Sequence, residues 1–227
     1  MNSSLHVSRF VFCIFLAALI ATGQAVAKDK LPQTSDDGLQ LIESKKVDAV
    51  YWKEGASLSD YKRVAILDCA VAFRKNWQRD QNQSRRSQSV KAEDMERIKK
   101  TLGEEFRTVF SKELEENGGY EIAEGANSDV LLLRPAIVDL DVSAPDLMEP
   151  GRTATFAASA GAMTLYLEIY DSATSSIIGR VIDRSSARDS GRIMMSSRVT
   201  NRAEADRMLR RWADLLRKAL DEAHENN

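Results

Sequence analysis

The stretch that most constrains the fold is residues 128–142, whose apolar pattern changes halfway along. Residues 130–133 are all apolar, which is typical of a strand covered on both faces. From residue 136 onward one face stays apolar while the other carries Asp139 and Asp141, as in a strand with one face in water. Such a strand needs other strands beside it and helices on its apolar face. The stretch therefore predicts a layered domain with both kinds of element.

The rest of the chain supplies these elements. Apolar residues recur every three or four positions over residues 92–117 and 201–222, which predicts two long amphipathic helices. Because the first helix connects two predicted strands, we expect those strands to be parallel. The predicted fold is α+β: a mixed sheet of about five strands, covered on one face by the two long helices. Besides the central stretch, its strands are residues 47–52, 63–71, 163–170 and 177–184, the last two forming a hairpin.

The first 27 residues have the pattern of a secretory signal peptide. Arg9 precedes an apolar run at residues 10–21, and Ala25 and Ala27 are the small residues expected at a cleavage site. The run is shorter than the roughly 20 residues of a membrane-spanning helix, so we expect cleavage after Ala27 instead of an uncleaved anchor. The mature protein would then be periplasmic, with no spanning segment.

The mature chain is expected to be one domain. Residues 28–38 contain a proline and turn-forming residues, so they are predicted to be a flexible N-terminal tether. Residues 39–223 are predicted to form a single α+β domain, which is large enough to bury its own core. Within this domain residues 74–91 have no apolar periodicity, which predicts a mobile basic loop.

Composition excludes some classes of function. The mature chain carries 31 basic and 34 acidic residues, so it lacks the basic excess of a nucleic-acid-binding protein. Its single cysteine, Cys69, excludes an intrachain disulfide, and its apolar neighbours predict a buried, unreactive thiol.

The sequence offers little support for catalysis. The mature chain has one histidine, His224, close to the C-terminus, so a histidine-dependent mechanism is not expected. It has no phosphate-binding loop, paired-cysteine metal motif or dinucleotide fingerprint. Asp139 and Asp141 share a predicted strand face and leave an enzyme or hard-cation site as an alternative, although solvated carboxylates are commoner there. We therefore predict a protein without enzymatic activity, cofactor or metal.

The predicted basic loop is the most positive part of the chain. Between Arg74 and Lys91 it has six basic residues and one acidic residue. One interpretation is a contact for an envelope protein or an anionic membrane surface. The other, which we favour, is a solvated loop whose aromatic side chains, Phe73 and Trp77, fold back on the core. The candidate partner-binding residues are Arg74, Lys75, Trp77, Arg79, Arg85 and Arg86.

The motifs that carry a family resemblance are residues 50–51, 58–64, 131–139 and 167–174, the amphipathic helix at residues 92–117, and Asp183. Together they resemble a family of uncharacterised bacterial exported proteins and lipoproteins, catalogued only as a domain of unknown function. The resemblance covers roughly residues 39–222 and implies a bacterial envelope location, with no known activity and no catalytic residues. This chain lacks the lipid-acceptor cysteine at the cleavage site that the lipoproteins of the family carry.

These observations predict a non-enzymatic periplasmic interaction module that supports an envelope assembly through its sheet edge or its basic loop. The alternative is a carrier of a small apolar or lipidic ligand, held between the sheet and the helices. The sequence sets no oligomeric state.

Overall fold

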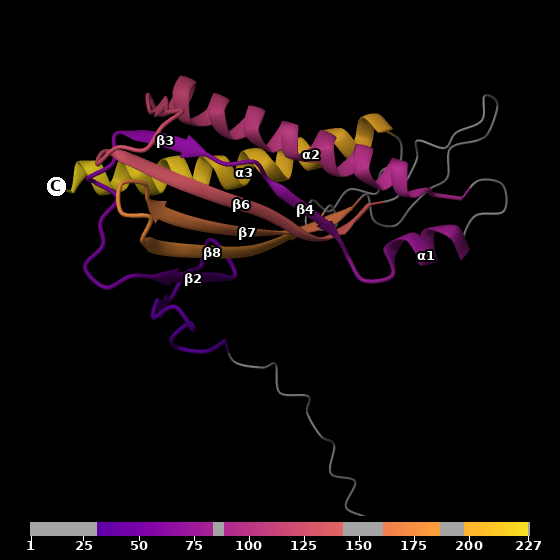
Figure 1. Ribbon diagram of the computed structural model, residues 1–227, viewed down its shortest axis with the longest axis horizontal. Helices are drawn as coiled ribbons and strands as arrows, with labels where there is room; N and C mark the ends of the chain where they lie inside the picture. The colour runs from indigo at the N-terminus through magenta and orange to yellow at the C-terminus, as the bar shows by residue number, and fades with distance from the viewer. Residues whose placement is uncertain (1–30, 84–88, 143–160, 187–197, 227) are drawn as a thin grey trace, which may run out of the picture. The chain divides into compact units, whose positions relative to one another are not determined.

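The central strand of the protein is β6 (Val130–Asp141), as its apolar pattern predicts. The structure, a computed structural model, describes residues 31–83, 89–142, 161–186 and 198–226 (Figure 1). The predicted signal peptide lies outside these residues. β7 (Ala162–Asp171) and β8 (Ile177–Ser186) form the expected antiparallel hairpin beside β6. On its other side β6 pairs in parallel with β3 (Arg63–Ile66), which confirms the predicted crossover.

The sheet is mixed and larger than predicted. Its eight strands lie in the order β1-β2-β8-β7-β6-β3-β5, and β4 pairs with β6 beyond the end of β3. The α+β class is confirmed, but the expected number of about five strands was too low. The strand predicted at residues 63–71 is divided into β3 and β4 (Ala70–Phe73), while β1 (Gln40–Ile42) and β5 (Glu121–Ile122) are additional. β2 (Ala49–Trp52) is the strand predicted at residues 47–52, and it lies between β1 and β8. Runs of two to four residues contain too little alternation to be recognised from sequence.

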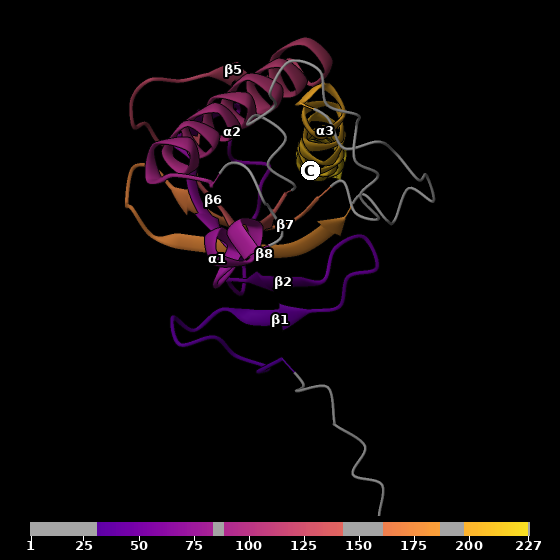
Figure 2. The same cartoon turned by 90° about the vertical axis from the view of Figure 1, so that its right-hand side faces the viewer.

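Both long helices pack on the same face of the sheet, as Figure 2 shows. They are α2 (Ala92–Lys112) and α3 (Arg198–Glu225), and α2 continues into a π-helical turn, η1 (Glu113–Asn117). Phe106 and Phe110 of α2 and Leu209 of α3 are fully buried against strand residues of the same core. Each fully buried side chain of this size contributes roughly 2 kcal/mol of apolar transfer free energy. This interface is therefore the main hydrophobic core.

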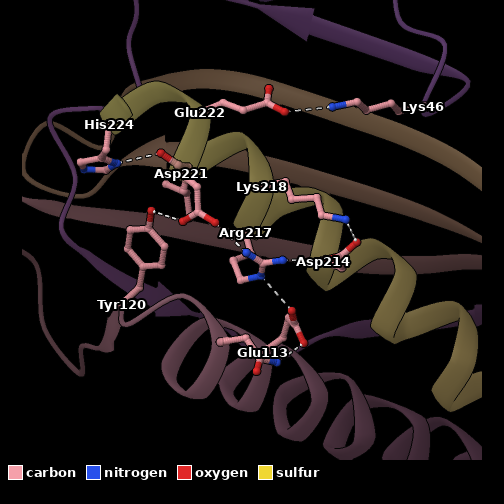
Figure 3. A network of polar contacts seen from close by, with 11 residues as sticks. Lys46, Glu113, Tyr120, Asp214, Arg217, Lys218, Asp221, Glu222 and His224 are labelled. Carbon is pink, nitrogen blue, oxygen red and sulfur yellow. Dashed lines mark hydrogen bonds and ion pairs between the residues drawn. The ribbon is translucent and has the colours of Figure 1, made fainter. Parts of the chain in front are cut away.

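A polar network joins the two helices where α3 passes η1 (Figure 3). Arg217 of α3 donates to Glu113 Oε1 at 2.9 Å and also binds Asp214 and Asp221. Tyr120 Oη donates to Asp221 at 2.8 Å. Since the apolar face of α3 is buried in the core and Arg217 is paired with three carboxylates, this helix is an internal packing element.

Residues 77–83, predicted to belong to a mobile loop, form the short helix α1 (Trp77–Gln83). Trp77 is only 1% exposed, stacks on Phe73 with ring centroids 4.1 Å apart and donates Nε1 to the Val142 carbonyl at 2.9 Å. The prediction was wrong because this helix depends on one buried aromatic anchor instead of a periodic apolar stripe. The rest of the predicted loop includes residues 84–88, which lie outside the described residues.

Residues 32–38, predicted to be part of a flexible tether, pack on the domain. Tyr51 Oη donates to the Pro32 carbonyl at 3.0 Å, and the Arg180 guanidinium binds the Asp37 carboxylate. Leu39 follows with 1% exposure and packs on Tyr51 and Ala49. These contacts form a second small apolar cluster on the sheet face opposite α2 and α3. The N-terminal segment therefore covers part of that face, beside β2 and β8.

Candidate functional site

Segments that carry the family resemblance meet at one end of the sheet. Tyr61 Oη donates to Asp171 Oδ2 at 3.0 Å, although the two residues are 110 positions apart. The other oxygen, Oδ1, accepts bonds from the backbone N–H and the hydroxyl of Thr174, both at 2.7 Å. Asp171 thereby fixes the turn between β7 and β8 against the segment that enters β3.

The loop between β5 and β6 is held to the same turn. Ser172 Oγ donates to the Asn127 carbonyl at 2.8 Å and accepts a bond from the Asn127 N–H at 3.0 Å. Arg63 donates to both carboxylate oxygens of Asp129, at 2.9 and 2.6 Å. Such bidentate pairs fix the relative orientation of the two side chains as well as pairing their charges. Residues 123–129 and the β7–β8 turn therefore form two walls in fixed positions.

The pKa values of Tyr61, Asp171 and Asp129, which hold these walls together, indicate a structural role. Burial, followed by the hydrogen bond to Asp171, raises the pKa of Tyr61 to about 12. Hydrogen bonds from Thr174 lower the pKa of Asp171, and the Arg63 guanidinium lowers the pKa of Asp129. Both carboxyl groups are consequently ionised at neutral pH and Tyr61 is protonated. A general acid or base works best with a pKa near the working pH, so these three groups are poorly suited to that task.

A groove of about 590 Å³ lies between the two walls and β3. Ala65, Leu67 and Leu132 line it with apolar surface, and Leu67 is 42% exposed. Residues 123–126 and the Ser172 and Ser175 positions supply its polar sides. The sequence predicted that both faces of residues 130–133 are covered, but Leu132 is only half-buried because it faces this groove. The apolar surface is therefore accessible at a place where the sequence predicted a closed core.

The groove also exposes a strand edge. Within the described residues β5 pairs only with Arg63 and Val64, while β3 continues along β6 to Ile66. Arg107 of α2 reaches this edge and donates Nη2 to the Ile66 carbonyl at 2.7 Å and to Asp68 at 3.2 Å. Unpaired strand edges are templates for an additional strand, and proteins commonly cover them with long charged side chains. Arg107 covers the β3 edge at Ile66 in this way.

The two carboxylates proposed as an alternative site lie at an irregular part of β6. Asp139 lies at a β-bulge with a φ of 51°, whereas Asp141 forms an ion pair with Arg74 at 3.0 Å. The bulge interrupts the regular strand alternation on which the prediction of a shared face depended. Among the described residues no group of three or more His, Cys, Asp or Glu side chains is arranged to hold a metal ion. Burial raises the pKa of Cys69 to about 12, as expected for an unreactive thiol.

The predicted basic site lies at the other end of β6 from the groove (Figure 1). Arg74 binds Asp80 at 2.7 Å in addition to Asp141, and Arg79 also binds Asp80. Lys75 is exposed. Trp77 is buried in the core, as the favoured interpretation of this loop predicted, so its side chain is not accessible to a partner. Arg85 and Arg86 lie outside the described residues, and the role of the basic side chains in binding stays a prediction.

Sequence reasoning did not find the groove. Its lining comes from five separate segments that only the fold brings together, and alanine, leucine and serine carry no chemical signature of binding. The available signal was the pattern of turn-forming residues at 58–64 and 171–174. These residues carry part of the family resemblance, but nothing in the sequence assigned them a role in binding. The other predicted location, between the sheet and the helices, is filled by side chains such as Phe106, Phe110 and Leu133.

The fold and the groove define an α+β protein with one mixed sheet and a framed, open strand edge. The chain belongs to the family described as protein of unknown function (DUF3313), whose model matches residues 32–216. No curated protein matches it. Among the described residues, no helix is both long and apolar enough to cross a membrane.

Two solved structures with similarity to the chain are dodecamers of PelC from Paraburkholderia phytofirmans, one of them a point variant. The variant has 9% sequence identity and a TM-score of 0.38, over 75% of this chain and 97% of that chain. The second has 13% identity and the same TM-score, over 73% and 96%. The family match, and not these structures, identifies the chain.

Proposed function

We propose that the protein is a non-enzymatic interaction module of the bacterial envelope that binds a partner through the groove beside β3. One observation carries the proposal: the groove combines accessible apolar surface with an open strand edge, between walls held by Tyr61, Asp171 and Ser172, which lie in segments that carry the resemblance. Such combinations are typical of sites that receive another polypeptide. The signal-like N-terminus supports export to the periplasm.

The groove is the better candidate than the basic loop. In the described part of that loop Arg74 and Arg79 are bound to acidic neighbours, and the aromatic side chain expected to insert into a partner is buried. Leu67, in contrast, is a large apolar side chain with 42% exposure inside the groove. Exposed apolar surface in a polar setting is a common mark of an interaction site.

Photo-crosslinking in intact cells tests the proposal. We replace Leu67 with a photoreactive amino acid in the full-length protein and use the same replacement at Ile42 as the control. The two side chains are matched, since Ile42 is 47% exposed but lies on β1. We expect irradiation to link position 67, and not position 42, to one envelope protein identified by mass spectrometry. No protein adduct at position 67, or the same adducts at both positions, would contradict the proposal.

A second variant separates the groove from the loop. Lys75, Arg79, Arg85 and Arg86 are replaced together by serine, and Arg74 is kept because it holds α1 to β6 through Asp80 and Asp141. The adduct at position 67 should persist in this background. Its loss would assign the partner to the basic loop.

A further inference from the structure

We infer that the occupant of the groove is an extended peptide segment of the partner, which adds to β3 as a further strand and displaces Arg107 from the edge. The inference rests on the proposed function and names the class of partner. The directions of the backbone N–H and carbonyl groups along β3 support it.

Hydrogen bonds that flank the edge fix these directions. The Leu67 N–H donates to the Leu133 carbonyl of β6 at 2.9 Å, whereas the Val64 carbonyl accepts from the Ala123 N–H on the β5 side, also at 2.9 Å. Successive residues of a strand direct their backbone groups to opposite sides in turn. Ala65 and Leu67 therefore direct theirs to β6, and Ile66 directs both its N–H and its carbonyl to the groove.

β5 leaves the edge at this point. Its last paired residue is Ile122, opposite Val64, and one further bond follows from Ala123. The space beside Ile66 is then lined by residues 123–126 and by Arg107. A peptide backbone in this space would continue the line of β5, accept a bond from the Ile66 N–H and donate one to the Ile66 carbonyl. An acyl chain supplies neither the acceptor for the Ile66 N–H nor the donor for the Ile66 carbonyl.

Arg107 is suited to leave the edge. Its side chain is 48% exposed and its second acceptor, Asp68, is fully exposed, so the guanidinium can retain Asp68 or water after losing the Ile66 carbonyl. The surfaces of Ala65 and Leu132 beside the edge are small and apolar. They select an apolar side chain at the peptide position that faces them, while the backbone bonds are independent of sequence.

The test uses the partner segment that carries the crosslink to position 67, synthesised as a peptide blocked at both ends. Binding to the intact mature protein is measured by titration calorimetry, and the Ile66 N–H is followed by NMR in labelled protein. We compare this peptide with versions N-methylated at single residues. Methylation of the one residue whose N–H donates to the Ile66 carbonyl should weaken binding about tenfold or more, because it removes the backbone donor at the edge, while methylation of the neighbouring residues should have little effect.

Replacement of Arg107 provides the matched protein variant. Arg107→Ala should bind the peptide about tenfold more tightly, since the peptide no longer competes with a charge-assisted hydrogen bond. Arg97→Ala, which removes an exposed arginine of α2 bound to Asp94, should leave the affinity unchanged. Leu67→Asp should abolish binding, and Ile42→Asp should not.

The outcomes distinguish the two proposals. If position 67 captures no partner segment, both fail. If the captured peptide binds but tolerates N-methylation at every residue, or leaves the Ile66 N–H resonance unchanged, the interaction module stands and strand addition is overturned. If the captured segment belongs to a second copy of this protein, the edge pairs two copies, and the proposal of a different envelope protein as partner is overturned.

Discussion

At the residue scale, Asp171 shows how one carboxylate positions a surface. It accepts bonds from Tyr61 and from two groups of Thr174, and so fixes the β7–β8 turn that forms one wall of the groove. These bonds lower the pKa of Asp171 below 3.8, its ordinary value. The unfolded chain therefore binds this proton more tightly than the folded protein, and acid favours unfolding through this group.

Asp171→Asn should expose this linkage. The ionised carboxylate stabilises the folded protein fully above about pH 5, and its contribution disappears as the pH falls through the lowered pKa. We expect the variant to be less stable than the wild type at about pH 6.5 and the difference to shrink towards about pH 2.5, as the Asp171 carboxyl group becomes protonated. Urea unfolding at both pH values measures it. A difference that does not change with pH would mean that charge is not involved.

At the element scale, the pairing of β2 with β8 depends on a missing side chain. Trp52 lies opposite Gly179, and a Cβ atom at Gly179 would lie 2.2 Å from Cζ3 of the indole. The indole is also held in place, because Trp52 Nε1 donates to the Ala56 carbonyl at 2.9 Å. Glycine in this strand is therefore required by close packing.

Gly179→Ala should force Trp52 away from β8. Overpacking of this kind costs about 2 kcal/mol of the free energy of unfolding. Gly125→Ala is the control, because an added Cβ there meets no atom within 4 Å, and its effect should stay within about 0.5 kcal/mol. Urea denaturation followed by circular dichroism compares the two variants. Equal stability of both would show that Trp52 can repack without cost.

The sequence predicted some of the elements and missed others. α2, the β7–β8 hairpin and the parallel pairing of β3 with β6 were confirmed because each leaves a periodic apolar pattern over many residues. β5 and α1 were missed because they are short and depend on contacts with distant residues, such as Trp77 with Val142. The groove was missed for the same reason: its walls are joined by bonds between Tyr61 and Asp171, and between Asn127 and Ser172.

At the scale of the whole molecule, Asp183 links three distant parts of the chain. This buried carboxylate of β8 accepts bonds from the Trp212 Nε1 at 2.7 Å, from Arg211 at 2.6 Å and from the Asp48 N–H at 3.1 Å. It thus connects α3, β8 and the start of β2. The resemblance identified Asp183 without giving it a role, and the structure assigns it this one.

Asp183→Ala should lower the free energy of unfolding by about 3 kcal/mol, because it leaves the buried Trp212 indole N–H without an acceptor and removes the carboxylate that binds Arg211. Asp206→Ala, which removes a partner of Arg210 on the surface of α3, should cost less than about 1 kcal/mol. Chemical denaturation of both variants measures the contrast. Similar small losses in both would mean that water replaces the buried carboxylate.

The sequence by itself determined the α+β class, the central strand, the hairpin and the two long helices, because burial of one face imposes a repeating pattern on neighbouring residues. Only the tertiary structure decided the eight-stranded sheet, the burial of Trp77 and the groove beside β3. Those features depend on residues that are far apart in the chain, and a contact between two distant residues imposes no pattern on the residues next to either of them.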